Sequence, residues 1–71
     1  MSESVYRVIE VIGTSSRSWE EAARTAVSTA SSTLRDLRVA EVTQQDVVIG
    51  DDGQVALFRV RLNLSFKYES D

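Results

Sequence analysis

The chain has 71 residues with 8 basic and 11 acidic side chains, a formal net charge of −3, and no histidine, cysteine or proline. The lack of cysteine and histidine excludes disulfides, thiolate chemistry, histidine-based catalysis and the commonest zinc ligands. The acidic balance disfavours a nucleic-acid backbone binder, and no stretch reaches the ~20 apolar residues that span a bilayer. We therefore expect a cytoplasmic protein without nucleic-acid or membrane partners. A chain this short buries only about 60% of its unfolded surface, so we expect oligomerisation to add stability.

The first element is predicted to be a strand over residues 5–12, which are rich in β-branched and aromatic side chains and end at Gly13. Its alternation is imperfect, because Arg7 and Glu10 fall on opposite faces. Apolar side chains on both faces indicate burial on both sides and hence a partner. Residues 13–17 are predicted to form a short polar connection.

A helix is predicted next, over residues 18–36. Ser18 and Glu21 have the spacing of a capping box, in which the Ser18 hydroxyl accepts from the Glu21 amide and the Glu21 side chain returns a bond. An alanine-rich apolar stripe with helical spacing follows: Trp19, Ala22, Ala23, Ala26, Val27, Ala30 and Leu34. The small side chains predict a helix that lies close on a sheet, with Trp19 packed against it.

Two further strands are predicted, joined by a hairpin. Residues 37–49 are rich in valine with a polar middle, and Gly50–Gly53 has the composition of a tight turn. Residues 55–68 carry apolar side chains at even positions and, from 59 onward, polar ones at odd positions, which is typical of a strand with one apolar face. The order strand, helix, strand, strand predicts an α+β fold in a single domain, residues 1–71.

The polar face of the last strand carries Arg59 and Arg61. We expect these cations to pair with Glu41 and Asp46 across the hairpin, each pair contributing about 0.2–1 kcal/mol. An enzyme that uses Arg59 with one of these carboxylates on a small anionic substrate has little support, because no nucleophile and base can be named. No Gly-rich phosphate loop is present either. The sequence therefore favours a protein that is not an enzyme.

Four segments together resemble the dodecin family. They are residues 5–15, the helix end at 33–37, Ala40–Val42 and Leu64–Lys67. The resemblance implies a β-α-β-β subunit whose three-stranded antiparallel sheet wraps around its helix. It also implies a homododecamer built from trimers, and a binding or storage function, since most dodecins bind and store flavin.

The flavin positions of that family differ in this chain. The family's flavin-stacking tryptophan precedes Ala40–Val42, where this chain has Val39, and its glutamine on the third strand is replaced by Arg59. Gln45 lies near the same pocket by the resemblance. Valine removes the aromatic sandwich, and arginine offers only hydrogen-bond donors. Binding of riboflavin or FMN therefore requires an altered pocket, with Trp19 or Phe58 as the substitute stacker.

The chain is more similar to the calcium dodecin branch, through features such as Ser18–Glu20, Arg38–Ala40 and Gln45–Asp46. The resemblance implies calcium as the ligand. Calcium takes six to eight oxygens, which no single segment supplies, so a site needs symmetry copies and water. The candidate ligands are Asp46, Gln45, Gln44 and Glu41. Alternatively, this polar stretch lines a hydrated channel or a subunit interface, and the shell has a structural role only.

Overall fold

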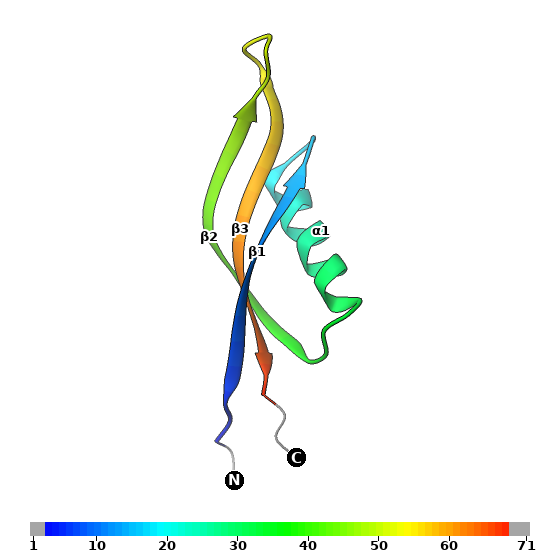
Figure 1. Ribbon diagram of the computed structural model, residues 1–71, viewed down its shortest axis with the longest axis vertical. Coiled ribbons are helices and arrows are strands. Elements are labelled where there is room, and N and C mark those ends of the chain that lie inside the picture. Colours follow the sequence, from blue (N-terminus) through cyan, green and yellow to red (C-terminus); the bar gives the residue numbers. More distant parts are fainter. Residues whose placement is uncertain (1–2, 69–71) are drawn as a thin grey trace.

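The computed structural model describes residues 3–68, so residues 1–2 and 69–71 of the expected domain 1–71 lie outside the described part (Figure 1). It contains one sheet and one helix. The elements are β1 (Tyr6–Ser15), α1 (Trp19–Ser31), β2 (Leu37–Ile49) and β3 (Val55–Lys67). The predicted α+β class and the β-α-β-β order are confirmed.

The sheet is antiparallel, with the order β1-β3-β2. Strand β3 is central, which explains the length of its alternating run: β1 pairs with its residues from Phe58 to Lys67, and β2 pairs with it from Val55 to Phe66. Beyond β1, the β2–β3 hairpin continues as a two-stranded arm (Figure 1). The molecule is accordingly elongated, with principal extents of 56 × 21 × 14 Å.

Strand β1 runs through Gly13 to Ser15, so the prediction that it ends at residue 12 is wrong. Gly13 pairs with Val60 and is buried. A Cβ atom at Gly13 would overlap the carbonyl oxygen of Ala22 and lie 2.9 Å from the Cβ of Ala26. Glycine at this position therefore lets the strand touch the helix, and does not stop the strand.

The start of α1 confirms half of the predicted capping box. The Ser18 hydroxyl accepts a hydrogen bond from the Glu21 amide at 3.0 Å. The Glu21 carboxylate, however, accepts from the Ser15 hydroxyl at 2.7 Å and from Arg17 Nε at 2.9 Å. The hydrogen bonds from Arg17 and then Ser15 lower the pKa of Glu21 to about 2. Glu21 therefore ties the helix start to the end of β1.

The helix ends at Ser31, five residues before the predicted end at Asp36. The hydroxyls of Ser31 and Ser32 donate to backbone carbonyls three residues earlier, at 3.1 and 2.7 Å. Such side-chain bonds compete with the helical hydrogen-bond pattern. Asp36 then adopts a φ of 60°, in the left-handed region, which turns the chain into β2.

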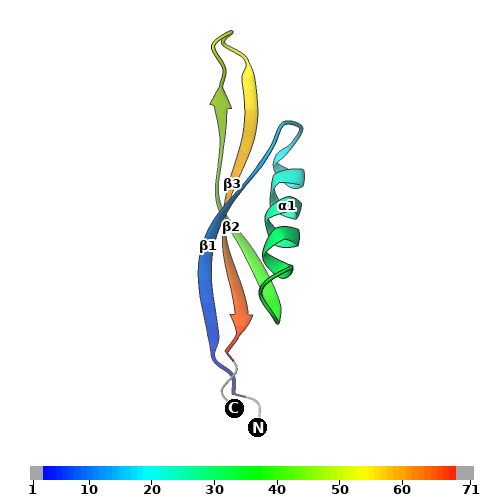
Figure 2. The ribbon, with the colours of Figure 1, turned by 45° about the vertical axis from the view of Figure 1, so that its right-hand side comes forward.

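The core lies between α1 and one face of the sheet, as Figure 2 shows for the two layers. Its buried residues are Ala22, Ala26, Val60, Leu62 and Leu64. The three residues from β3 are each 1% exposed, which confirms the predicted apolar face of that strand. Among the described residues, no helix is long and apolar enough to cross a membrane.

Candidate functional site

The face of the sheet opposite α1, here called the open face, holds most of the predicted site residues. Antiparallel partners point to the same side of a sheet, so the register assigns each side chain to a face. From the central strand the open face receives Arg59, Arg61, Asn63, Ser65 and Lys67. Its edges supply Tyr6, Val8, Glu10, Ile12 and Thr14 on β1, and Val39, Glu41, Gln44 and Asp46 on β2.

Asp46 and Arg59 form the ion pair that was predicted across the hairpin. Both carboxylate oxygens of Asp46 accept from the guanidinium, at 2.7 Å from Nε and 3.0 Å from Nη2. These hydrogen bonds lower the pKa of Asp46 and raise the pKa of Arg59. Two parallel hydrogen bonds between one guanidinium and one carboxylate are the strong form of such an ion pair, and both carboxylate oxygens of Asp46 take part.

Trp19 packs on the sheet as predicted, beside Asp46 of β2. Its indole N–H donates to the backbone carbonyl of Asp46 at 3.0 Å. Its ring meets Phe58 edge to face, with 5.2 Å between centroids and 82° between planes. The single tryptophan therefore fastens the start of α1 to the β2–β3 hairpin.

The expected pairing of Arg61 with Glu41 or Asp46 is wrong. Arg61 Nη1 lies 3.4 Å from a carboxylate oxygen of Glu10, on β1. The reason is the sheet order, which places β1 directly beside the central strand. Glu10 and Glu41 both lie opposite Asn63, one on each side of it. Glu41 has no ion pair with any of residues 3–68.

The four calcium candidates do not share one face. Glu41, Gln44 and Asp46 lie on the open face, whereas Gln45 pairs with Val60 and lies on the helix side. An irregularity between Val42 and Gln44 separates Glu41 from the other two. Within the described part of the chain, no three histidine, cysteine, aspartate or glutamate side chains gather as a metal site requires. The described part of the chain therefore spreads these oxygens along β2 and does not gather a coordination shell.

The flavin positions are also far apart within the chain. Val39 lies opposite Ser65, while Arg59 lies opposite Asp46. Ser65 and Arg59 are six positions apart on β3, which is about 20 Å at ~3.3 Å per residue. Val39 is 57% exposed and Arg59 is held in its ion pair. Within residues 3–68, Val39 and Arg59 are therefore far apart, and Gln45 lies on the other face of the sheet.

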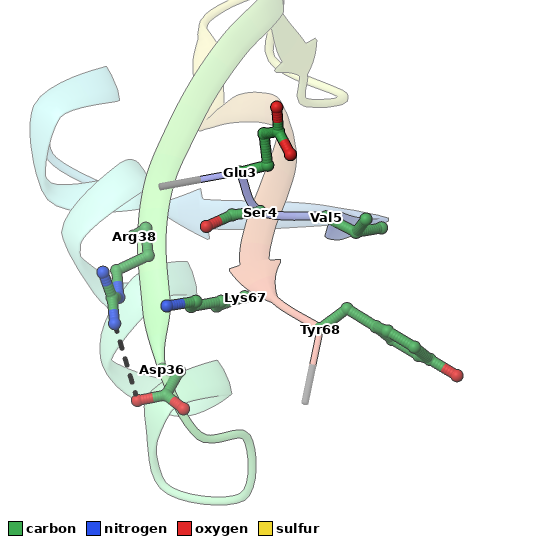
Figure 3. A pocket seen from close by; sticks show the side chains of 7 residues that line it. All are labelled: Glu3, Ser4, Val5, Asp36, Arg38, Lys67 and Tyr68. Carbon is green, nitrogen blue, oxygen red and sulfur yellow. Dashed lines mark ion pairs between the residues drawn. The ribbon is translucent and has the colours of Figure 1, made fainter. Parts of the chain in front are cut away.

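A hollow at one end of the molecule, beside Asp36, was missed in the sequence. This hollow, of about 570 Å³, is lined by residues 3–5, Asp36, Arg38, Lys67 and Tyr68 (Figure 3). A second hollow of about 590 Å³ lies between α1 and β2. The only sequence signal for the first was the pair of arginines around residue 36, since Lys67 is distant in the chain.

Comparison with known proteins gives consistent matches over nearly the whole chain. The Dodecin family model matches residues 5–69. Calcium dodecin of Mycobacterium tuberculosis is 47% identical over 64 residues, covering 90% of this chain and 89% of that protein. The structure of dodecin from Streptomyces coelicolor superposes with a TM-score of 0.91 at 49% identity, covering 100% of both chains. The structure of the Mycobacterium tuberculosis protein is described as calcium chelating with a novel calcium-binding site. It superposes with a TM-score of 0.83 at 44% identity, covering 96% of each chain. The chain therefore belongs to the dodecin family.

Proposed function

We propose that this chain is a non-enzymatic, cytoplasmic binding and storage protein that assembles into a homododecamer built from trimers and binds calcium. The observation that carries the proposal is the open face, where β2 presents the oxygens of Glu41, Gln44 and Asp46 and Val39 replaces an aromatic stacker. The 47% identity to a protein named calcium dodecin supports the choice of ligand.

The small core supports self-assembly. Among residues 3–68, five buried residues form the core, while eleven large hydrophobic side chains remain exposed. They include Val5, Tyr6 and Val8 at one end of the sheet and Ile49 and Val55 at the tip of the arm. Complete burial of a fully exposed side chain of this kind contributes about 1.5–3 kcal/mol, and these side chains, which are 37–66% exposed, would contribute a corresponding fraction. Copies of the same chain that cover these surfaces would supply the stability that the single subunit lacks.

Calcium chemistry fits the open face only in an assembly. The ion requires six to eight oxygens at ~2.3–2.6 Å, more than one subunit presents in one place. Of the two carboxylates among the candidates, Glu41 is the one without an ion pair to the described residues, and it lies opposite the neutral amide of Asn63. Arg59 already donates to both carboxylate oxygens of Asp46, so calcium and the guanidinium would compete for this carboxylate. Gln45 joins a site only with oxygens of a neighbouring copy.

Calorimetric titration of the intact assembly with calcium tests the proposal. We expect Glu41→Gln and Asp46→Asn each to weaken calcium binding by about tenfold, because each removes one charged ligand. Glu20→Gln is the matched control, since Glu20 pairs with Arg24 on the exposed side of the helix at 3.1 Å. Equal affinity in all three variants would remove these residues as ligands. Absence of calcium binding by the unmodified protein would overturn the assigned ligand.

Flavin is the alternative ligand, and the aromatic side chains argue against it. Trp19 and Phe58 pack on each other, and the indole N–H is bonded to the Asp46 carbonyl. A flavin that stacks on either ring would have to break this arrangement. Quenching of riboflavin fluorescence on titration with the protein would favour the alternative, and unchanged fluorescence would exclude it.

A further inference from the structure

The β2–β3 arm ends in an exposed turn, Gly50–Gly53, which contributes nothing to the proposed calcium site. The Gly53 amide donates to the Gly50 carbonyl at 3.0 Å, and the Gly50 amide donates to the Gln54 carbonyl at 2.8 Å. Residues 51–54 are all exposed. The turn is therefore closed by two backbone hydrogen bonds and is open to water.

The tip of the arm has the weakest support in the sheet. Strand β1 ends at Ser15, opposite Phe58, so within the described chain no third strand reaches residues 55–57. The pairing of β2 with β3 is also irregular between Val48 and Ile49. Segments with few buried contacts and solvent-exposed hydrogen bonds open locally at a low cost in free energy. The turn can therefore open while the core stays folded.

Asp52 is the aspartate of this chain that is followed by glycine. The other aspartates precede Leu37, Val47 and Asp52 itself, or end the chain at Asp71. A side chain on the following residue hinders the approach of a carboxyl group to that residue's backbone nitrogen, and glycine has none. A Cβ atom at Gly53 would meet no other heavy atom within 4 Å. The peptide nitrogen of Gly53 is therefore unhindered.

The Asp52 carboxylate lies back over this peptide. Its Oδ1 accepts a hydrogen bond from the Gln54 amide at 3.0 Å, two residues ahead, which is the arrangement of an Asx turn. The φ of Gly53 is 79°, a value that residues with a side chain rarely adopt. The turn thus requires glycine at 53 and keeps the Asp52 carboxyl group beside the Gly53 peptide.

We propose that Asp52 is a site of isoaspartate formation, and that the product is a substrate for a protein isoaspartate methyltransferase. In the first step the Gly53 nitrogen bonds to the carboxyl carbon of Asp52, and the carboxyl hydroxyl leaves as water with the amide proton. A water molecule then opens the cyclic succinimide. Cleavage between the Gly53 nitrogen and the backbone carbonyl carbon of Asp52 leaves the chain linked through the side chain, whereas cleavage of the other imide bond restores aspartate.

The product changes both the turn and its chemistry. Isoaspartate adds one carbon to the main chain between the positions that the Gly53–Gly50 hydrogen bond joins, and it removes the side-chain oxygen that accepts from Gln54. It also carries a free α-carboxylate. This group accepts the methyl group of S-adenosylmethionine, with release of S-adenosylhomocysteine, which is the reaction of the methyltransferase. The proposal does not depend on the calcium assignment.

Ageing of the intact assembly at physiological temperature and neutral pH in oxygen-18 water tests the proposal. Peptide mass spectrometry with electron-transfer fragmentation locates isoaspartate, and we expect it at residue 52 with an oxygen-18 atom incorporated there. A purified protein isoaspartate methyltransferase with labelled S-adenosylmethionine should label the aged protein at the same residue. Asp51 is the matched control, because it is exposed in the same turn but precedes a residue with a side chain. We expect its conversion to be slower by about tenfold or more.

Two variants sharpen the test. Asp52→Glu keeps the charge but requires a larger ring, so conversion at this position should be lost. Asp52→Asn should convert faster than the unmodified protein, because an amide is not ionised and releases ammonia. No isoaspartate at residue 52 of the unmodified protein, or equal conversion at Asp51 and Asp52, would overturn the proposal whether or not the variants fold.

Discussion

Gly13 controls how closely β1 approaches α1, and its substitution by alanine gives the sharpest test of the packing. The added Cβ would lie 2.9 Å from the Ala26 Cβ, whereas carbon atoms in contact lie about 3.5–4.0 Å apart. It would also overlap the Ala22 carbonyl oxygen. That oxygen belongs to the helix backbone, so it cannot move alone. The helix would have to shift away from Val60, Leu62 and Leu64.

The expected cost of Gly13→Ala is about 1–3 kcal/mol of unfolding free energy, the usual range for overpacking. Alanine also restricts the unfolded chain, which by itself would stabilise the fold by about 0.4–1 kcal/mol. A net loss therefore requires the clash to exceed this gain. Gly50→Ala is the matched control, because a Cβ there has the flexible Asp52 side chain as its nearest neighbour, at 3.2 Å, and the φ of Gly50 is not positive.

Urea denaturation followed by circular dichroism measures both variants at one fixed protein concentration, since the proposed assembly would make stability depend on concentration. We expect a lower midpoint for Gly13→Ala and a change of at most about 0.5 kcal/mol for Gly50→Ala. Equal midpoints for the two variants would refute the inferred close approach of strand and helix.

Three further variants test other parts of the structure. Leu62→Ala should cost about 2–5 kcal/mol, because it opens a cavity in a five-residue core, and an unchanged denaturation midpoint would contradict the assigned core. The Glu21 pKa of about 2 lies below its ordinary value of 4.5, so the stabilisation from its hydrogen bonds is complete above about pH 4.5 and is lost as the pH falls toward 2. In Arg17→Gln, melting temperatures between these pH values should fall less steeply with acid than in the unmodified protein; parallel curves would exclude this role. Trp19→Phe keeps a ring beside Phe58 but removes the hydrogen-bond donor to the Asp46 carbonyl. We expect the free energy of unfolding, measured by denaturation, to fall by about 0.5–1.5 kcal/mol. An unchanged value would show that this hydrogen bond does not stabilise the fold.

The fold was largely predictable because its longest elements carry local signals. The alternation after residue 55 and the Gly50–Gly53 turn fix the hairpin, and both strand starts, at Leu37 and Val55, agree with the structure. The boundaries that failed depend on distant or competing contacts. Gly13 is required by the helix that packs on it, and the serine hydroxyls near residue 31 end α1 before its apolar stripe does.

The candidate site was less predictable because it depends on strand order. Pairing of Asp46 with Arg59 follows from the hairpin alone and was predicted. Pairing of Arg61 with Glu10 requires that β1 lie next to β3, which no local pattern in the sequence indicates. The hollow beside Asp36 was missed for the same reason, since Lys67 reaches the loop at Asp36 only through the sheet. The calcium ligands stay a prediction, because oxygens from neighbouring copies are needed to complete the site.

Native mass spectrometry with and without added calcium tests the central claim most directly. The account predicts a dodecamer that gains discrete calcium adducts, and these adducts should survive competition by excess magnesium. Monomers or dimers alone would contradict the proposed assembly. A dodecamer that binds riboflavin and no calcium would contradict the proposed ligand.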